Sequence, residues 1–262
     1  MRRTSMLKIG VCAATAWMIA CTGCVICPGD RLTCKAERTQ ELGAAAADVA
    51  ALDVKTDVGD ITLEAAETDE VHITAEITVK AKTDEQAERL LQAVRVTAEP
   101  SGDTLVIKAR KPADFGRNQL AVDFKIAAPA RLRLRCVADV GNIRAEGFAG
   151  PVEARTDVGN VSCTGLRAAA NLRTSVGDVR AAYVADAPAA LDLTMTTDVG
   201  NVNFTGPTEI SANLDASSDV GSIHTSRPLT VTGTVSKSIK ASLGDTKGRI
   251  SLRTNVGSIH IQ

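Results

Sequence analysis

The feature that most constrains this chain is a short motif that recurs seven times around a glycine. Each copy has Asp, Ser or Asn, then Val, Gly, a small polar residue and Ile or Val, usually with Thr or Ser in front. The seven glycines are Gly59, Gly141, Gly159, Gly177, Gly200, Gly221 and Gly257, and a degenerate copy surrounds Gly244. From Gly141 onward, with Gly244 included, the intervals are 18, 18, 23, 21, 23 and 13 residues. Self-similarity at about 20 residues predicts a solenoid.

Apolar residues take fixed places around each glycine. Around Gly200, for example, they stand seven and five residues before it and two and four residues after it: Leu193, Met195, Val202 and Phe204. This alternation predicts two short strands per repeat, each with one buried face. The glycine provides a positive φ or a close backbone approach, and the flanking Asp and Asn tolerate the turn and can bond nearby amides.

The composition agrees with a thin core. Hydrophobic residues make up 44% of the chain but aromatic residues only 2%, so Ala, Val, Leu and Ile must fill the interior. So few rings count against stacking platforms for nucleic-acid bases or sugars. With 30 basic and 31 acidic residues, the net charge of −1 gives no long-range attraction to a polyanion, and we expect no nucleic-acid partner.

The region between the first two copies does not repeat. Val71–Val79 alternates like a strand, and Thr83 with Gln86 forms a capping box that predicts a short helix. Further strands are expected near Val94–Ala98, Thr104–Lys108 and Gln119–Ala127. This region is predicted to be a β-rich cap that contains one helix.

The predicted fold is therefore all-β: a single-stack, β-helix-like solenoid over residues 131–262, preceded by the first repeat and the cap over 51–130. Stacked hairpins that form a β-sandwich are the alternative. The period leaves the handedness of the solenoid open. The last rung ends at Gln262, and its backbone edges are expected to be unpaired unless the last residues or a partner cover them, which favours self-association or docking of another chain at an open C-terminal rung.

The N-terminal sequence predicts an export signal. Residues 1–20 combine Arg2, Arg3 and Lys8 with an apolar run that is too short to span a bilayer permanently. The run ends in a sequence that resembles a bacterial lipobox before Cys21, which predicts lipidation of Cys21, or alternatively of Cys24. Residues 21–50 are then a lipidated, Cys-rich tether, and the protein is a membrane-anchored lipoprotein of the outer membrane, periplasm or cell surface. A plain cleaved signal is the alternative.

The cysteines divide into two groups. Cys21, Cys24, Cys27 and Cys34 have spacings that suit a metal or iron–sulfur cluster, but lipidation removes Cys21, and a Cys27–Cys34 disulfide is the simpler prediction. Cys136 and Cys163 fall on inward positions of the repeats and are predicted to be buried thiols.

Two candidate binding chemistries arise from the repeats. The stacked Asp and Asn side chains suit either a calcium ladder or a structural turn. Five of the seven copies have Asn or Ser where a ligating carboxylate would be needed, which favours the turn. A row four residues before the glycine contains Lys55, Arg155, Arg173 and Arg253, and is either a solvated face or a weak basic strip for phosphate or acidic glycan.

Catalytic chemistry has little support in the sequence. Only three histidines occur, and His224 and His260 are expected about 10 Å apart, with the degenerate rung between them, which is too far to share one zinc ion. We expect no enzyme activity, metal or cofactor. A polysaccharide-active β-helix with paired carboxylates is the alternative.

The repeated T-x-x-G-[DN]-[IV] motif, the opening Leu52–Leu63 strand pair and the Ala128–Leu132 lead-in resemble the bacterial "putative adhesin" domains of unknown function. The resemblance covers residues 50–262. It implies an exported or tethered β-solenoid and brings no catalytic residues. The sequence thus predicts a non-enzymatic binding or structural scaffold of the cell envelope, with an unidentified protein or glycan ligand.

Overall fold

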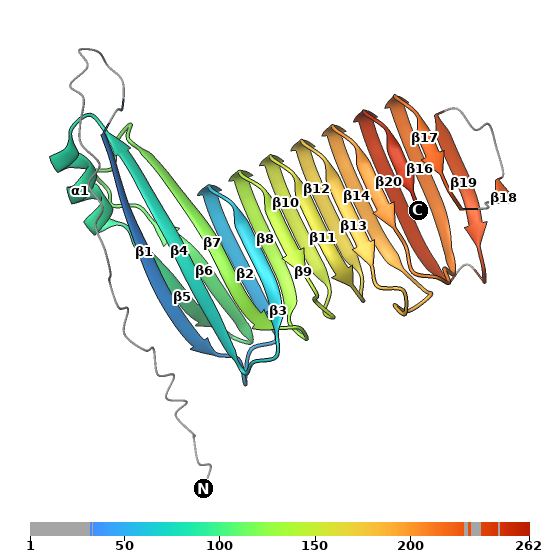
Figure 1. The fold of residues 1–262 in the computed structure, drawn as a ribbon, viewed down its shortest axis with the longest axis horizontal. Helices are drawn as coiled ribbons and strands as arrows, with labels where there is room; N and C mark the ends of the chain where they lie inside the picture. The colour runs from blue at the N-terminus through green and yellow to red at the C-terminus, as the bar shows by residue number, and fades with distance from the viewer. Residues whose placement is uncertain (1–31, 33, 228–229, 232–236, 246) are drawn as a thin grey trace, which may run out of the picture.

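Two long β-sheets make up most of the structure (Figure 1). The computed structural model describes residues 32, 34–227, 230–231, 237–245 and 247–262. Inward side chains from both sheets form one continuous apolar core. The described part of the chain has one helix, α1 (Asp84–Ala93), and no helix there is long and apolar enough to cross a membrane.

Sheet A has ten strands. In spatial order they are β1 (Cys34–Ala45), β4 (Glu70–Ala81), β7 (Gln119–Pro129), β3 (Ile61–Ala66), β9 (Ile143–Glu146), β11 (Val161–Leu166), β13 (Val179–Tyr183), β15 (Val202–Thr205), β21 (Ile259–Ile261) and β17 (Ile223–Thr225).

Sheet B has eleven strands. In spatial order they are β18 (Thr230–Val231), β19 (Ser238–Leu243), β16 (Ala212–Val220), β20 (Gly248–Val256), β14 (Asp192–Val199), β12 (Ala170–Val176), β10 (Val152–Val158), β8 (Arg133–Val140), β2 (Ala51–Val58), β6 (Thr104–Arg110) and β5 (Arg95–Ser101).

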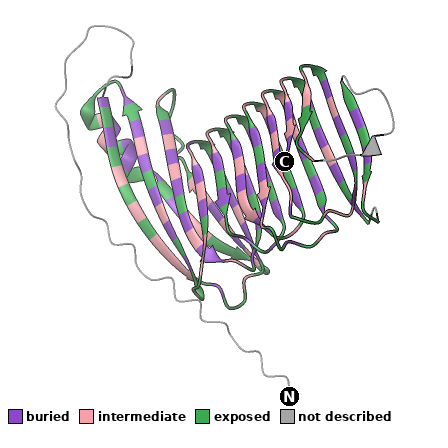
Figure 2. Cartoon of the chain, turned by 45° about the vertical axis from the view of Figure 1, so that its right-hand side comes forward, coloured by how far each residue is buried: buried purple, intermediate pink, exposed green. Residues whose placement is uncertain are grey.

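Each repeat is one rung of the stack. The chain runs along a strand of sheet B, turns at the glycine and continues along a strand of sheet A, as β10 and β11 do around Gly159. Neighbouring rungs are parallel and in register, so that Val152 lies beside Leu134 on one side and Ala170 on the other. Buried and exposed residues alternate along these strands (Figure 2). The predicted all-β, solenoid-like fold is confirmed.

The spatial order of the rungs differs from their order in the sequence at both ends. The first repeat, β2–β3, lies between β6–β7 and β8–β9, and the last repeat, β20–β21, lies between β14–β15 and β16–β17. Both strands of the last repeat are therefore paired on both sides, and the expectation of an open C-terminal rung is wrong. Because every rung presents the same inward pattern, the pattern fixes the register but does not specify which rung is the neighbour.

The degenerate copy around Gly244 also departs from expectation. Its strand, β19, pairs antiparallel with β16 near the end of sheet B and does not form a rung between the Gly221 and Gly257 repeats. The pattern of apolar residues before Gly244 is that of any half-buried strand, so it predicts a strand without fixing its direction.

The helix-bearing region lies at the opposite end of the stack. Helix α1 begins after Thr83, whose hydroxyl accepts a hydrogen bond from the Gln86 amide at 3.2 Å, and it buries Ala87, Leu90 and Leu91. The tether expected over residues 21–50 is wrong from Cys34 onward, because β1 pairs along its whole length with β4. β1 is an edge strand with few apolar residues, so its composition resembles that of a linker.

Candidate binding surface

The hinge glycines have the backbone that only glycine adopts readily. Their φ values lie between +135° and +154°. At Gly177, a Cβ atom would stand 2.1 Å from the carbonyl oxygen of Gly159 in the adjacent rung, and the other hinge glycines show similarly close approaches. Positive φ and close approach therefore act together at the hinge, and both follow from the tight stacking of identical turns.

Hydroxyl groups three residues before the glycines join adjacent rungs. Thr156 donates to the carbonyl of Gly141 at 2.9 Å, and Thr174 donates to that of Gly159 at 2.8 Å. Thr197, Thr254 and Ser218 repeat this contact at 2.8 Å. These side chains are nearly fully buried, on the inward side where the alternation predicts an apolar residue. We call these hydroxyl-to-carbonyl hydrogen bonds between rungs the clamp. The recurring Thr or Ser in front of the motif is its sequence signal.

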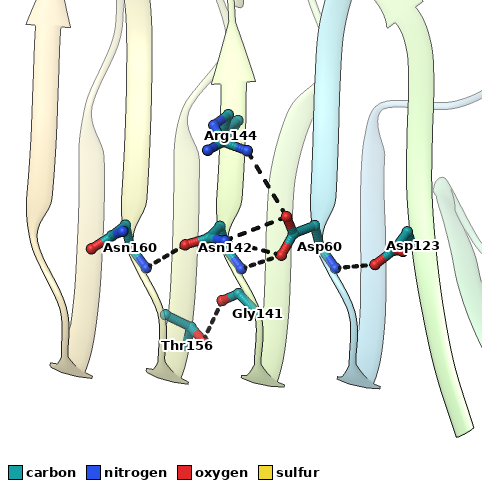
Figure 3. A network of polar contacts seen from close by, with 7 residues as sticks. All are labelled: Asp60, Asp123, Gly141, Asn142, Arg144, Thr156 and Asn160. Atoms are coloured by element: carbon teal, nitrogen blue, oxygen red, sulfur yellow. Dashed lines mark hydrogen bonds and ion pairs between the residues drawn. The ribbon is translucent and has the colours of Figure 1, made fainter.

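The residue after each glycine continues the pattern on the other side of the turn (Figure 3). The side-chain oxygen of Asp60 accepts the Asn142 amide at 2.8 Å, that of Asn142 accepts the Asn160 amide at 3.0 Å, and that of Asn160 accepts the Asp178 amide at 2.8 Å. We call this series, which also includes Asp123, Asn201 and Ser258, the Asx ladder. Asp123 lies outside the repeats, and no motif in the sequence identified it.

This geometry favours the structural turn over the calcium site. Carboxylate and amide oxygens of the Asx ladder are used to accept backbone N–H groups, and Asn serves as well as Asp because only one acceptor is needed. Among the described residues, no group of three or more His, Cys, Asp or Glu side chains is placed to hold a metal ion.

The two central cysteines are deep in the core. Cys136 and Cys163 are at most 1% exposed, on β8 and β11. Burial raises the pKa of the Cys163 thiol to about 12 and raises that of Cys136 as well. Neither thiolate is accessible near neutral pH, and both side chains act as small apolar groups.

Cys34, at the start of β1, is also buried, and its Sγ atom lies 3.6 Å from the carbonyl oxygen of Lys82. Its predicted disulfide partner Cys27 and the lipidation candidates Cys21 and Cys24 lie outside the described residues. The disulfide and the lipidation therefore stay predictions.

The predicted separation of the two C-terminal histidines is wrong. His224 and His260 occupy paired positions on β17 and β21, and their rings stack with centroids 5.2 Å apart. Ser222 Oγ lies 2.8 Å from His224 Nε2 and 3.2 Å from Ser258 Oγ. The error comes from the assumed rung order, since β21 lies directly beside β17.

The basic row expected four residues before the glycines is present on the outer face of sheet B. Lys55, Arg155, Arg173 and Arg253 align across it, together with Lys108 on β6. Carboxylates neutralise part of the row: Lys55 lies 3.6 Å from Asp53, and Arg155 lies 3.3 Å from Asp157.

A groove of about 640 Å³ crosses the same face of sheet B. Its charged side chains include Asp53, Arg135 and Glu153, which form a chain of ion pairs at 3.3 and 3.8 Å. The charges in this groove therefore largely compensate one another.

A second row, on the outer face of sheet A, has a different character. Three residues after each hinge glycine, and at Lys125 on β7, the side chains align in register across eight strands; in spatial order they are Lys125, Thr62, Arg144, Ser162, Arg180, Asn203, His260 and His224. We call this series the donor row, because each side chain can donate a hydrogen bond and none carries a negative charge. A hollow of about 230 Å³ lies beside it, lined by Arg180, Asn203, Thr205, His260 and other residues.

Residues 133–262 match the family described as Toastrack DUF4097. This segment, 130 of the 262 residues, is similar to the Toastrack family. The resemblance to adhesin-type domains of unknown function that the repeated motif indicated is confirmed. No curated protein matches the chain.

Two solved structures are similar to this chain at low sequence identity. A putative cell adhesion protein from Clostridium sporogenes is 11% identical, with a TM-score of 0.45 over 85% of this chain and 98% of that chain. A putative adhesin from Bacteroides fragilis is 12% identical, with a TM-score of 0.43 over 86% of this chain and 97% of that chain.

Most of the donor row lies in the segment that matches the Toastrack family. Six of its eight members, from Arg144 to His224 in spatial order, fall within residues 133–262, and Lys125 and Thr62 extend it onto the preceding strands. Exposed valines mark the hinge edge of the same stack: Val58, Val140, Val158, Val176, Val199, Val220 and Val256 are 42–62% exposed. Outward side chains of the stack thus align in straight rows across the strands.

Proposed function

We propose that this protein is an exported, membrane-tethered lipoprotein whose Toastrack stack acts as a non-enzymatic, adhesin-like binding scaffold of the cell envelope. The observation that carries the proposal is the in-register alignment of outward side chains over the rungs of both sheets. Backbone hydrogen bonds hold these side chains at intervals of about 4.8 Å. Such a surface is preorganised for an extended ligand that makes the same contact several times.

The hinge motif supports the same role. Its glycine, hydroxyl and Asx side chains are all engaged between rungs, as in the contacts of Thr174 and Asn160. The most repeated residues of the chain therefore stabilise the stack and leave the outward rows free to vary. A fixed scaffold with variable outward positions is typical of binding repeat proteins.

The tether is proposed from the sequence of residues 1–31. A lipid on Cys21 together with a second acyl chain would anchor the protein stably, because each buried methylene contributes about 0.8 kcal/mol. Twelve residues lie between Cys21 and the start of β1 at Cys34, which makes thirteen residue steps. At 3.3–3.6 Å per residue, this segment spans at most about 45 Å, so the stack would stay close to the membrane surface.

The test is the intact mass and membrane partitioning of the native protein beside Cys21→Ala and Cys24→Ala variants. We expect a diacylglycerol-sized mass increment and membrane association, both lost in Cys21→Ala and kept in Cys24→Ala. The reverse pattern would assign the lipid to Cys24. A soluble, unmodified native protein would refute the tether and indicate a freely secreted protein.

A further inference from the structure

The donor row is set apart from the other charged surfaces by the placement of carboxylates around it. On sheet B, the basic row has Asp53 and Glu153 on one side and Asp57, Asp157 and Asp198 on the other. On sheet A, a neighbouring row lies two residues after the donor row, on the side away from the hinge. It begins with Glu64 and Glu146 on β3 and β9, and it continues on the next strands with Thr164, Ala182 and Thr205. The part of the donor row from β11 to β15 therefore lies beside neutral side chains on this flank.

On its hinge flank the donor row from β11 to β17 borders the Asx ladder. The ladder side chains there are Asn160, Asp178, Asn201 and Ser258, with Ser222 beside Ser258, and Asp178 is the one carboxylate among them. Its Oδ1 atom already accepts hydrogen bonds from the backbone and side-chain nitrogens of Asn201, at 2.7 and 3.2 Å. This leaves a surface rich in hydrogen-bond donors with little opposing charge.

Arg180 is the central cation of this surface. It is exposed on β13, and no ion pair or hydrogen bond joins its guanidinium to another residue that the structure describes. Lys125 and Arg144 differ, since Lys125 Nζ lies 2.7 Å from Glu76 Oε1 and Arg144 Nη1 lies 3.9 Å from Asp60 Oδ2. Arg180 therefore has its donors available, next to the amide of Asn203 and the hollow that His260 closes.

The spacing of the row suggests the form of its ligand. Lys or Arg stands on every second strand from β7 to β13, at Lys125, Arg144 and Arg180, with Thr62 and Ser162 between them. Asn203, His260 and His224 follow on the next three strands. At about 4.8 Å per strand, these Lys and Arg side chains recur every ~9.6 Å, and the whole row is about 34 Å long. This alternation suits a chain that presents anionic groups at intervals, with hydroxyl groups between them.

We propose that the donor row, centred on Arg180, Asn203 and His260, binds a linear acidic polysaccharide laid across the strands of sheet A. The guanidinium and the hollow receive a carboxylate or sulfate group, and the Ser, Thr and Asn side chains contact sugar hydroxyls. The row has no Phe, Tyr or Trp to stack on a base, and its Ser, Thr and Asn side chains suit sugar hydroxyl groups, so the surface favours an acidic glycan over a single-stranded nucleic acid. The inference deepens the proposed scaffold function by naming its ligand class.

The test measures binding of the purified full-length protein, kept in detergent, to polygalacturonate and to heparin as carboxylate and sulfate probes. The critical variant is Arg180→Gln. Its matched control is Arg173→Gln, which makes the same charge change in the same rung but on sheet B. We expect Arg180→Gln to weaken binding by about tenfold, as for loss of a charge-assisted hydrogen bond, and Arg173→Gln by less than twofold. Arg180→Lys should restore part of the affinity.

Ligand length is the second readout. Oligomers long enough to cross four or more strands should bind at least about tenfold more tightly than the monosaccharide acid, because several contacts act together. Equal losses in Arg180→Gln and Arg173→Gln would show non-specific charge attraction and overturn the proposal. Absence of binding to either probe, or equal affinity for monomer and oligomer, would also overturn it. Lipidation and membrane association are measured separately, so failure of the tether leaves this outcome unaffected.

Discussion

Replacement of Gly177 by Ala should destabilise the protein by about 2–6 kcal/mol. A non-glycine residue at φ +143° costs about 1–3 kcal/mol. The new Cβ would also stand 2.1 Å from the Gly159 carbonyl oxygen, so the two rungs must separate. Separation strains two contacts of 2.8 Å, from Thr174 Oγ1 to the Gly159 oxygen and from the Asp178 amide to Asn160 Oδ1, each worth about 0.5–1.5 kcal/mol.

Thermal unfolding and urea titration measure this loss. For a chain of this size, 1 kcal/mol corresponds to about 2–4 °C, so a loss near the middle of the range lowers Tm by about 8–16 °C. Gly177→Val should be worse, because a branched side chain adds atoms at the same contact.

Two other glycines separate the causes of the effect. Gly43 lies in β1 without a positive φ, and a Cβ there would meet nothing within 4 Å; Gly43→Ala should change stability by less than about 1 kcal/mol. Gly102 has φ +65° and equally open surroundings, so Gly102→Ala should cost only the conformational term of about 1–2 kcal/mol. If Gly177→Ala cost no more than Gly102→Ala, the close approach of the rungs would not contribute, and the reasoning would be refuted.

The remaining predictions concern the clamp and the buried thiols. Thr174→Val should lower the free energy of unfolding in urea by about 1–2 kcal/mol, because the Gly159 carbonyl loses its buried hydrogen-bond donor. Thr174→Ser, which keeps the hydroxyl as Ser218 does, should lower it by less. Equal losses in the two variants would contradict the clamp. Burial raises the pKa of Cys163 from 9.0 to about 12, so the folded state keeps a proton that the unfolded chain loses. The stability contribution of this thiol is complete below pH 9 and falls by at most about 1.4 kcal/mol per unit as pH rises toward 12. Cys163→Ala should therefore have a shallower alkaline loss of stability than the native protein; equal slopes would contradict the assignment.

Much of the fold could be predicted because each repeat can be recognised from residues that lie a few positions apart in the sequence. Apolar residues two and four places after the glycine, such as Val161 and Cys163, alternate with polar ones, and this period of two determines both the strand and its buried face. The capping box at Thr83 fixes the start of α1 in the same local way. These features depend on contacts within a few residues, so no knowledge of the tertiary structure is needed.

The candidate site was only partly predictable. The sequence places His224 and His260 at equivalent outward positions, and it places Arg144 and Arg180 at that same position in other repeats. Their alignment into one row with Lys125 depends on which strands are neighbours. Lys125 follows no hinge glycine, and β7 joins the row only through its parallel pairing with β3. The row therefore has no complete signature along the chain.

The sequence by itself determined the rung: two half-buried strands, a glycine turn that tolerates no side chain, and polar residues able to bond between turns. Only the tertiary structure decided the order of the rungs, with β2–β3 and β20–β21 each placed between other repeats. The physical reason is that the rungs present nearly equivalent edges and inward faces, so local sequence cannot distinguish one neighbour from another. The choice depends on how the connecting segments and the end strands pack, and it is this choice that stacks His224 on His260 and forms the donor row.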